Sequence, residues 1–207
     1  GDPVHLARKY SDNGADELCM LDIKASHEKR KTFLKTVEAI AKVIDIPLTV
    51  GGGVSDIKDI TTLLNAGADK VSINTTAVLN PNLIKISSLK HGSQCIVVAI
   101  DGKRYGKKML VTIKGGRERT NKTVVSWAKN VQNLGAGELL VTSMDTDGMV
   151  TFLMVQRLQA ANFNGRCQCW RHGNQRQCNI WHVLHVDLWQ GAKLLRPCNA
   201  SQTLSLN

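Results

Sequence analysis

The alternation of short apolar runs with amphipathic helical segments is the feature that most constrains the fold of this 207-residue chain. The run CIVVAI is almost wholly apolar, as expected for a strand that is covered on both faces. Alternating strands and helices predict a parallel sheet with helices packed around it. The predicted strands are residues 17–23, 47–50, 69–73, 95–100 and 138–143.

The spacing of apolar side chains predicts five helices, one before the first strand and one between each pair of successive strands. In the second of them, the spacing of the apolar residues matches one face of a helix. Ser55 is the expected N-cap of the third, which runs to Leu64. The predicted helices are residues 4–12, 29–44, 56–64, 81–89 and 123–134.

An internal repeat narrows the choice of fold. GADEL at residues 14–18 recurs as GAGEL at residues 135–139, which is 121 residues later. This separation is about half of a ~250-residue (βα)8 barrel, so the repeat fits a barrel built from two halves. An open, doubly wound sheet is the less favoured alternative, because no GxGxxG motif follows a strand. We therefore expect an α/β fold of the (βα)8 TIM-barrel type that is incomplete, because 207 residues are short for a closed barrel.

The chain changes character near residue 150. Four of its six Cys and three of its four Trp lie in the last quarter. We recognise no strand in this part and expect two units: a partial barrel over 1–150 and an aberrant tail over 151–207, either out of frame or disordered. The tail also holds residue types that bind zinc, but their spacing contains no CxxC pair, so we predict no metal. These residues are Cys167, Cys169, His172, Cys178, His182 and His185.

The net charge of +10 bears on the kind of ligand. Nucleic acid is disfavoured, because the basic residues form no single stripe with aromatic residues, which make up only 4% of the chain. A solvated surface or attraction to a small anionic substrate explains the charge better. No apolar run approaches the ~20 residues of a membrane helix, and the start lacks the features of a secretory signal. We therefore expect a cytoplasmic protein that binds neither nucleic acid nor membranes.

Polar residues gather where the predicted strands end. A lone Asp at such a position usually caps the next helix, but three strands that end on Asp favour an active site at the carboxyl ends of a barrel. The segment 103–121 interrupts the strand–helix rhythm and is polar and basic, so we expect a hairpin that covers this site. The polar residues at the strand ends are Asp22, Asn74, Thr75, Asp101, Asp145 and Asp147.

Two glycine features at these strand ends suggest phosphate binding. Gly51, Gly52 and Gly53 follow the second strand, where backbone N–H groups can approach a phosphate. Asn74 and Thr75 on the next strand end would add donors to the same anion, and the Asp147–Gly148 step offers a similar feature across the barrel. Two facing anion sites predict an elongated bisphosphate substrate.

Charged residues also stand at the entry of three strands: Glu17, Lys70 and Glu138. Charges that point into the base of a barrel are costly unless they are paired. The alternatives are a salt-bridge network that plugs the barrel and a gate through which a small molecule enters from below.

Six blocks of the sequence, spread over residues 1–150, resemble the cyclase subunit family of imidazole glycerol phosphate synthase, an enzyme of histidine biosynthesis. In order they are GDPVHLARKYSDNGADEL, LDIKAS, IPLTVGGGV, GADKVSINTTAV, GSQCIVVAID and GAGELLVTSMDTDG. The chain departs from the family in two places. The family's first strand, with a catalytic Asp, is not found before Gly1, and the family's last strands are not found after residue 150.

The resemblance implies an ammonia-dependent cyclase/lyase without a cofactor. Its substrate would be phosphoribulosyl-formimino-aminoimidazole carboxamide ribotide, and its products imidazole glycerol phosphate and aminoimidazole carboxamide ribotide. It also implies a heterodimer with a glutaminase subunit. Two other interpretations stay open: an inactive relative that only binds phosphate or the glutaminase, and the sister phosphoribosyl-formimino isomerase.

The resemblance also assigns roles to individual residues. Asp147 and Asp101 would be catalytic. Gly53, Asn74 and Thr75, with Gly52 beside them, would bind one phosphate, and Gly148 the other. Glu17, Lys70 and Glu138 would form the ammonia gate, and Asp69 and Gln94 would face the glutaminase.

Overall fold

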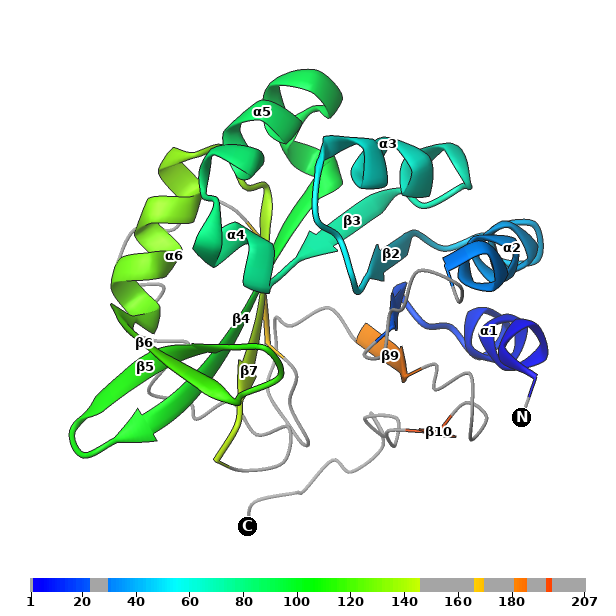
Figure 1. Cartoon of the computed structure of the whole chain (residues 1–207). Helices are drawn as coiled ribbons and strands as arrows, with labels where there is room; N and C mark the ends of the chain where they lie inside the picture. The colour runs from blue at the N-terminus through cyan, green and yellow to red at the C-terminus, as the bar shows by residue number, and fades with distance from the viewer. Residues whose placement is uncertain (1, 23–29, 146–165, 170–180, 186–192, 195–207) are drawn as a thin grey trace, which may run out of the picture.

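The computed structural model of the chain describes residues 2–22, 30–145, 166–169, 181–185 and 193–194, with the backbone alone for residues 30–32 and for the last three segments (Figure 1). The helices are α1 (Pro3–Asp12), α2 (Arg30–Ala41), α3 (Ile57–Asn65), α4 (Thr75–Leu79), α5 (Asn82–His91), η1 (Ser93–Cys95) and α6 (Val124–Asn133). The strands are β1 (Glu17–Leu21), β2 (Leu48–Gly51), β3 (Lys70–Ile73), β4 (Ile96–Tyr105), β5 (Lys108–Ile113), β6 (Glu118–Thr123), β7 (Glu138–Ser143), β8 (Arg166–Cys169), β9 (Trp181–His185) and β10 (Lys193–Leu194).

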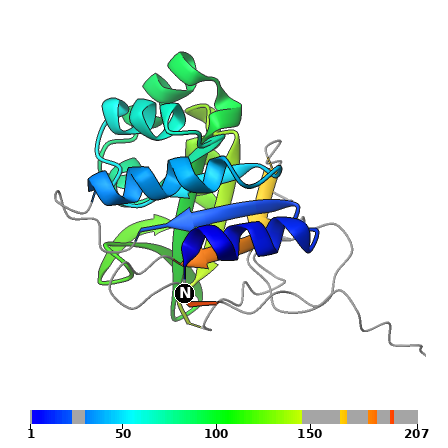
Figure 2. The same ribbon diagram turned by 90° about the vertical axis from the view of Figure 1, so that its right-hand side faces the viewer.

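The predicted parallel sheet is confirmed. Seven strands lie side by side and parallel in the order β9, β1, β2, β3, β4, β7 and β8. The helices α1, α2, α3, α5 and α6 form an arc outside these strands (Figure 1), which is the arrangement of a βα barrel. A turned view shows α1 and α2 beside β1 (Figure 2).

Alternation along the strands divides the buried side chains into two groups. In β4, Ile96, Val98 and Ile100 belong to the large core that packs against the helices. Val97 and Ala99 face the other way and join a small inner cluster with residues of β1 and β7. Successive strand residues point to opposite faces, so a strand that is apolar throughout can fill both layers.

The predicted hairpin after the fourth strand is present. The strand β4 continues to Tyr105 and pairs antiparallel with β5, which pairs in turn with β6. Three consecutive residues of the β5–β6 turn, Lys114, Gly115 and Gly116, have positive φ. Glycine adopts this conformation without cost, and Lys114 is the one non-glycine residue with positive φ in the described part of the chain.

Two local predictions for helices need correction. The N-cap of α3 is Asp56 and not Ser55, because the Asp56 carboxylate accepts hydrogen bonds from the backbone N–H groups of Lys58 and Asp59. Ser55 instead donates its hydroxyl to Asp59, whose side chain closes a capping box with Asp56. The short helix α4, with five residues, is too brief to leave a periodic signal and was missed.

The structure also has strands after residue 150, where we recognised none in the sequence. The strand β8 pairs with β7 at one side of the sheet and β9 pairs with β1 at the other. Without these pairings, β7 and β1 would be edge strands whose backbone groups lack partners. Pairing with these edges creates strands in segments whose local pattern shows none. The status of 151–207 as an aberrant unit remains a prediction, since most of these residues lie outside the described ranges. In the described parts, no helix is both long and apolar enough to span a membrane.

Candidate functional site

Asp101 and Asn74 form the centre of the candidate site. Asp101 lies in β4 and Asn74 follows the neighbouring strand β3, so both stand toward the carboxyl ends of parallel strands. The Asn74 side-chain amide donates a hydrogen bond to an Asp101 carboxylate oxygen at 2.8 Å. The other polar atom of this amide, Asn74 Oδ1, is buried and has no hydrogen-bond partner among the described residues. It is therefore an acceptor that a bound ligand could use.

The environment of Asp101 makes its carboxyl group harder to ionise than that of an exposed aspartate. Burial raises the pKa of this carboxyl group above its ordinary value, and the hydrogen bond from Asn74 opposes the shift in part. A carboxyl group whose pKa is raised takes up a proton more readily than a free aspartate and can pass it on to a reacting group. Asp101 thus has the properties of a general acid or base.

The glycine turn after β2 lies against the end of β1. Gly52 and Gly53 both have positive φ, and a Cβ added at Gly52 would overlap the carbonyl group of Asp22. The backbone N–H of Asp22 donates to the carbonyl of Gly51 at 2.9 Å, which holds the two segments together. Asp22 is buried. The turn therefore requires glycine for both conformation and space.

The start of α4 connects the glycine turn with the hairpin. The hydroxyl of Thr76 donates to the carbonyl of Val54 at 2.6 Å. The hydroxyl oxygen of Thr75 accepts a hydrogen bond from the backbone N–H of Lys114 at 3.0 Å. Because Thr75 acts here as an acceptor, its O–H can still donate to an anion.

Asp145 supports the hairpin at the end of β7. Its carboxylate accepts a hydrogen bond from the backbone N–H of Arg104 at 2.6 Å, and its side chain is exposed. Of the predicted residues, Asp22, Gly52, Gly53, Asn74, Thr75 and Asp101 all lie at the carboxyl ends of strands. Asp147 and Gly148 lie outside the described residues.

The three charged residues at the strand entries form one buried network. The Lys70 ammonium lies 2.9 Å from a Glu17 oxygen and 2.8 Å from a Glu138 oxygen. The side chains of Lys70, Glu17 and Glu138 are 12%, 4% and 6% exposed, respectively. Burial disfavours the charged form of Lys70, but the hydrogen bonds to Glu138 and Glu17 outweigh this effect and raise its pKa. The predicted salt-bridge network is thus present at the strand entries.

Thr49 is a member of this network that sequence reasoning missed. Its hydroxyl donates to the second Glu17 oxygen at 2.7 Å and is fully buried. The signal was a lone hydroxyl in an apolar strand, beside the partner strand that carries Glu17. The neighbouring thiol of Cys19 has a raised pKa, first through burial and second through the charge of Glu17, and is therefore unreactive.

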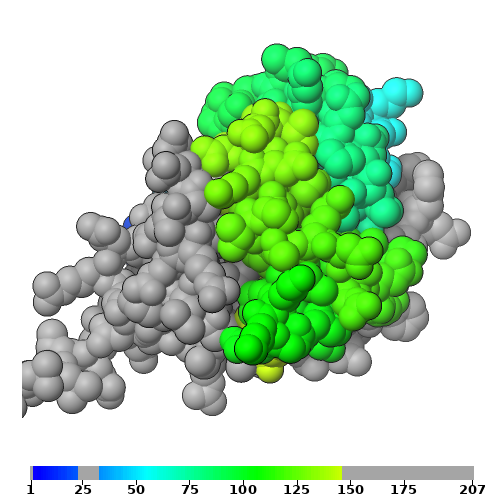
Figure 3. All heavy atoms as spheres, turned by 90° about the vertical axis from the view of Figure 1, so that its left-hand side faces the viewer, coloured from blue at the N-terminus to red at the C-terminus, as the bar shows by residue number. Residues whose placement is uncertain are grey.

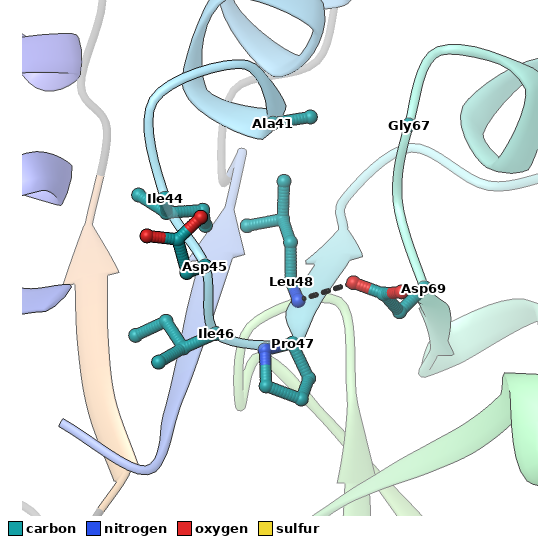
Figure 4. A pocket seen from close by; sticks show the side chains of 8 residues that line it. All are labelled: Ala41, Ile44, Asp45, Ile46, Pro47, Leu48, Gly67 and Asp69. Carbon is teal, nitrogen blue, oxygen red and sulfur yellow. Dashed lines mark hydrogen bonds between the residues drawn. The ribbon is translucent and has the colours of Figure 1, made fainter.

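A surface depression of about 340 Å³ lies near this end of β2 and β3 (Figure 4). Asp69 lines it and accepts a hydrogen bond from the backbone N–H of Leu48 at 2.8 Å. Gln94 is exposed on η1, close to Gly92. Asp69 and Gln94 are thus on the surface near the strand entries, away from Asp101. The depression is lined by Ala41, Ile44, Asp45, Ile46, Pro47, Leu48, Gly67 and Asp69.

The strands form a parallel sheet with helices outside it, and the candidate acid and the glycine turn lie at the carboxyl ends of the strands. This arrangement defines a protein of the βα-barrel class. Within this class, the family described as "Histidine biosynthesis protein" matches residues 1–164, and the chain belongs to that family. This finding confirms the resemblance seen in the sequence.

Curated relatives carry the name imidazole glycerol phosphate synthase subunit HisF. The protein of Campylobacter concisus (strain 13826) is 56% identical over 149 residues, which are 72% of this chain and 59% of the relative. Two Prochlorococcus marinus proteins, of strains MIT 9215 and MIT 9312, are 57% and 58% identical over 151 residues, with the same coverage of each chain. The chain thus spans about three fifths of the length of these relatives.

Proposed function

We propose that this chain carries the ammonia-dependent cyclase/lyase chemistry of imidazole glycerol phosphate synthase. The reaction converts phosphoribulosyl-formimino-aminoimidazole carboxamide ribotide to imidazole glycerol phosphate and aminoimidazole carboxamide ribotide. The observation that carries the proposal is the partly buried Asp101, held by Asn74 at the same ends of the strands as the glycine turn, in a chain 56–58% identical to subunits named for this synthase. We expect this activity in the cytoplasm.

In this proposal Asp101 moves protons during ring closure. Burial raises the pKa of its carboxyl group, which makes the protonated form of Asp101 easier to reach than that of an exposed aspartate. The first phosphate binds at Gly52, Gly53, Asn74 and Thr75, where the Asn74 and Thr75 side chains can donate hydrogen bonds. Asp147 as the second catalytic acid and Gly148 at the second phosphate remain predictions for residues that the structure does not describe. No step needs a metal or an organic cofactor.

Ammonia enters, in the same proposal, from the opposite end of the strands. Lys70, Glu17 and Glu138 form the gate, supported by their contacts at the strand entries. A glutaminase subunit supplies the ammonia and docks at Asp69 and Gln94, supported by their exposure near the same end. The buried ion pairs must rearrange for ammonia to pass, which a bound partner can drive through contacts of its own.

The test is turnover of the ribotide by the 207-residue chain in the presence of an ammonium salt. We expect formation of aminoimidazole carboxamide ribotide, and a rate lower by at least about 10²-fold in Asp101→Asn. The exposed variant Asp12→Asn on α1 is the matched control and should keep the parent rate. Turnover of the isomerase substrate alone would contradict the proposal. Ribotide binding without turnover would support the inactive relative instead.

A further inference from the structure

The β4–β6 hairpin concentrates positive charge. From Gly102 to Lys122 the chain has eight basic residues and one acidic residue, Glu118. All the basic side chains except Lys103 are exposed. We call residues 102–122 the basic hairpin. Its basic residues are Lys103, Arg104, Lys107, Lys108, Lys114, Arg117, Arg119 and Lys122.

This charge is not typical of the rest of the chain. Residues 1–69 have nine basic and eleven acidic residues, so their charges are mixed. On the basic hairpin, the structure records one ion pair within the described residues, between Lys114 and Glu118 at 2.6 Å. Arg119 lies over the ring of Tyr105, with 5.1 Å between the guanidinium carbon and the ring centre. A solvated surface mixes signs of charge, whereas this ribbon carries eight basic residues and one acidic residue.

The basic hairpin is attached to the candidate site at three points. The hydroxyl of Thr112 donates to the backbone carbonyl of Asp101 at 3.1 Å. The turn donates from Lys114 N–H to the hydroxyl of Thr75, and the base of the hairpin donates from Arg104 N–H to Asp145. The positive ribbon is therefore fixed in place beside Asp101 and the predicted phosphate site.

Figure 1 shows β5 and β6 next to the end of β7 and to α4, which begins at Thr75. Figure 3 shows the hairpin as a protruding surface below α6. From this place its field extends over the approach to the carboxyl ends of the strands, within a Debye length of about 10 Å at 0.1 M ionic strength.

We propose that the basic hairpin steers a bisphosphate substrate into the site by long-range electrostatic attraction. The inference rests on the proposed function for the identity of the substrate, which carries two phosphates. Clustered charges of one sign raise the local concentration of an oppositely charged ligand and its association rate by about 10- to 10³-fold at low ionic strength. Because the attraction acts at a distance, added salt should remove it.

The experiment compares two triple variants with the same loss of charge. The hairpin variant is K107Q/K108Q/R117Q, and the control is K42Q/K85Q/K129Q, whose exposed lysines lie outside the hairpin. Dissociation constants for the ribotide and for fructose 1,6-bisphosphate are measured at low and high ionic strength, about 20 mM and about 500 mM. We expect the hairpin variant to bind on the order of tenfold more weakly at low salt. The difference should shrink below about twofold at high salt, where the Debye length is a few Å. The control should match the parent.

Equal weakening in both triple variants would overturn the inference, because net charge alone would then explain the effect. A loss that persists at high salt would also overturn it, since it would indicate direct contact. So would hairpin-dependent binding of a single-stranded DNA oligonucleotide with unchanged sugar bisphosphate binding, because the hairpin would then serve nucleic acid. Failure of the parent to turn over the ribotide contradicts the proposed function alone. In that case, binding of fructose 1,6-bisphosphate still tests whether the basic hairpin attracts a bisphosphate. A parent protein that binds neither compound contradicts both the proposed function and the steering.

Discussion

At the scale of single residues, the same burial that equips Asp101 for chemistry works against folding. A carboxylate without a nearby cation is costly to bury, and the hydrogen bond from Asn74 offsets only part of this cost. Lys70 shows the opposite balance, because two carboxylates hold its ammonium form. Substitutions at these two sites should therefore change the stability of the fold in opposite directions.

Replacing Asp101 with Asn should stabilise the fold at neutral pH. The folded-state pKa of Asp101 is raised, so its ionisation disfavours the folded state. This penalty is complete above the raised pKa and disappears below the ordinary value of 3.8. Urea unfolding should give Asp101→Asn a higher free energy of unfolding than the parent at about pH 8, and a smaller gain at about pH 4. A gain that does not depend on pH would show that ionisation is not its cause.

Replacing Lys70 with Met should destabilise the protein by about 3–5 kcal/mol, because two buried carboxylates lose their shared cation. The matched control is Glu17→Gln/Lys70→Met/Glu138→Gln, which should recover much of the stability. Urea unfolding measures all three proteins. A loss below about 1 kcal/mol would contradict the buried network.

At the scale of elements, loops rather than strands shape the candidate site. The glycine turn after β2 packs against Asp22, and the start of α4 is tied to Val54 through Thr76 and to the hairpin through Thr75. The strands supply the frame, and side-chain-to-backbone hydrogen bonds set the position of each loop on it. A change in one loop should therefore affect anion binding more than it affects the sheet.

Gly52→Ala tests this coupling. Alanine at this position has both a left-handed backbone and a clash with the Asp22 carbonyl. Gly106→Ala is the control, since Gly106 has positive φ but no atom near an added Cβ. We expect a cost of about 1 kcal/mol in the control, from conformation alone, and a larger cost in Gly52→Ala. Phosphate binding, measured by calorimetry, should be lost only in Gly52→Ala. Equal stability and equal phosphate binding in the two variants would show that a Cβ at Gly52 does not clash with the Asp22 carbonyl.

At the scale of the whole molecule, segments far apart in sequence complete the sheet. The strand β9 pairs with β1, and β8 pairs with β7. Residues after 165 therefore add one parallel strand at each edge of the sheet formed by residues 1–145. Unpaired edge strands promote association between molecules. The segment that lacks a strand pattern is thus the one that covers the edges.

A chain that ends at residue 150 should therefore be less soluble than the full chain. It would expose the backbone groups of β1 and β7 that β9 and β8 now pair. We expect a higher proportion of aggregates in sedimentation velocity and an earlier onset of thermal aggregation. The full-length variant K42Q/K85Q/K129Q, which keeps residues 151–207, is the control and should behave like the parent. A monomeric, soluble 1–150 chain would contradict this role of the tail.

The amino-acid pattern of residues 1–145 was enough to predict their strands and helices, apart from the short helices α4 and η1, and the end of the sheet at which the candidate site lies. Apolar periodicity depends on neighbours along the chain, so it revealed the strand Glu138–Ser143 without error and the helix Pro3–Asp12 within a residue. The alternation of strands and helices also required parallel pairing, which places all strand ends, and thus Asp101 and Asn74, at one edge.

Only the tertiary structure decided which partners these residues have. The hydrogen bonds of Asn74 to Asp101 and of Thr49 to Glu17 join residues 27 and 32 positions apart, a separation at which local patterns carry no information. The strands β8 and β9 form because edges elsewhere in the fold need hydrogen-bond partners. Local periodicity reports which side of an element is buried, whereas pairing between distant segments depends on the three-dimensional arrangement that burial creates.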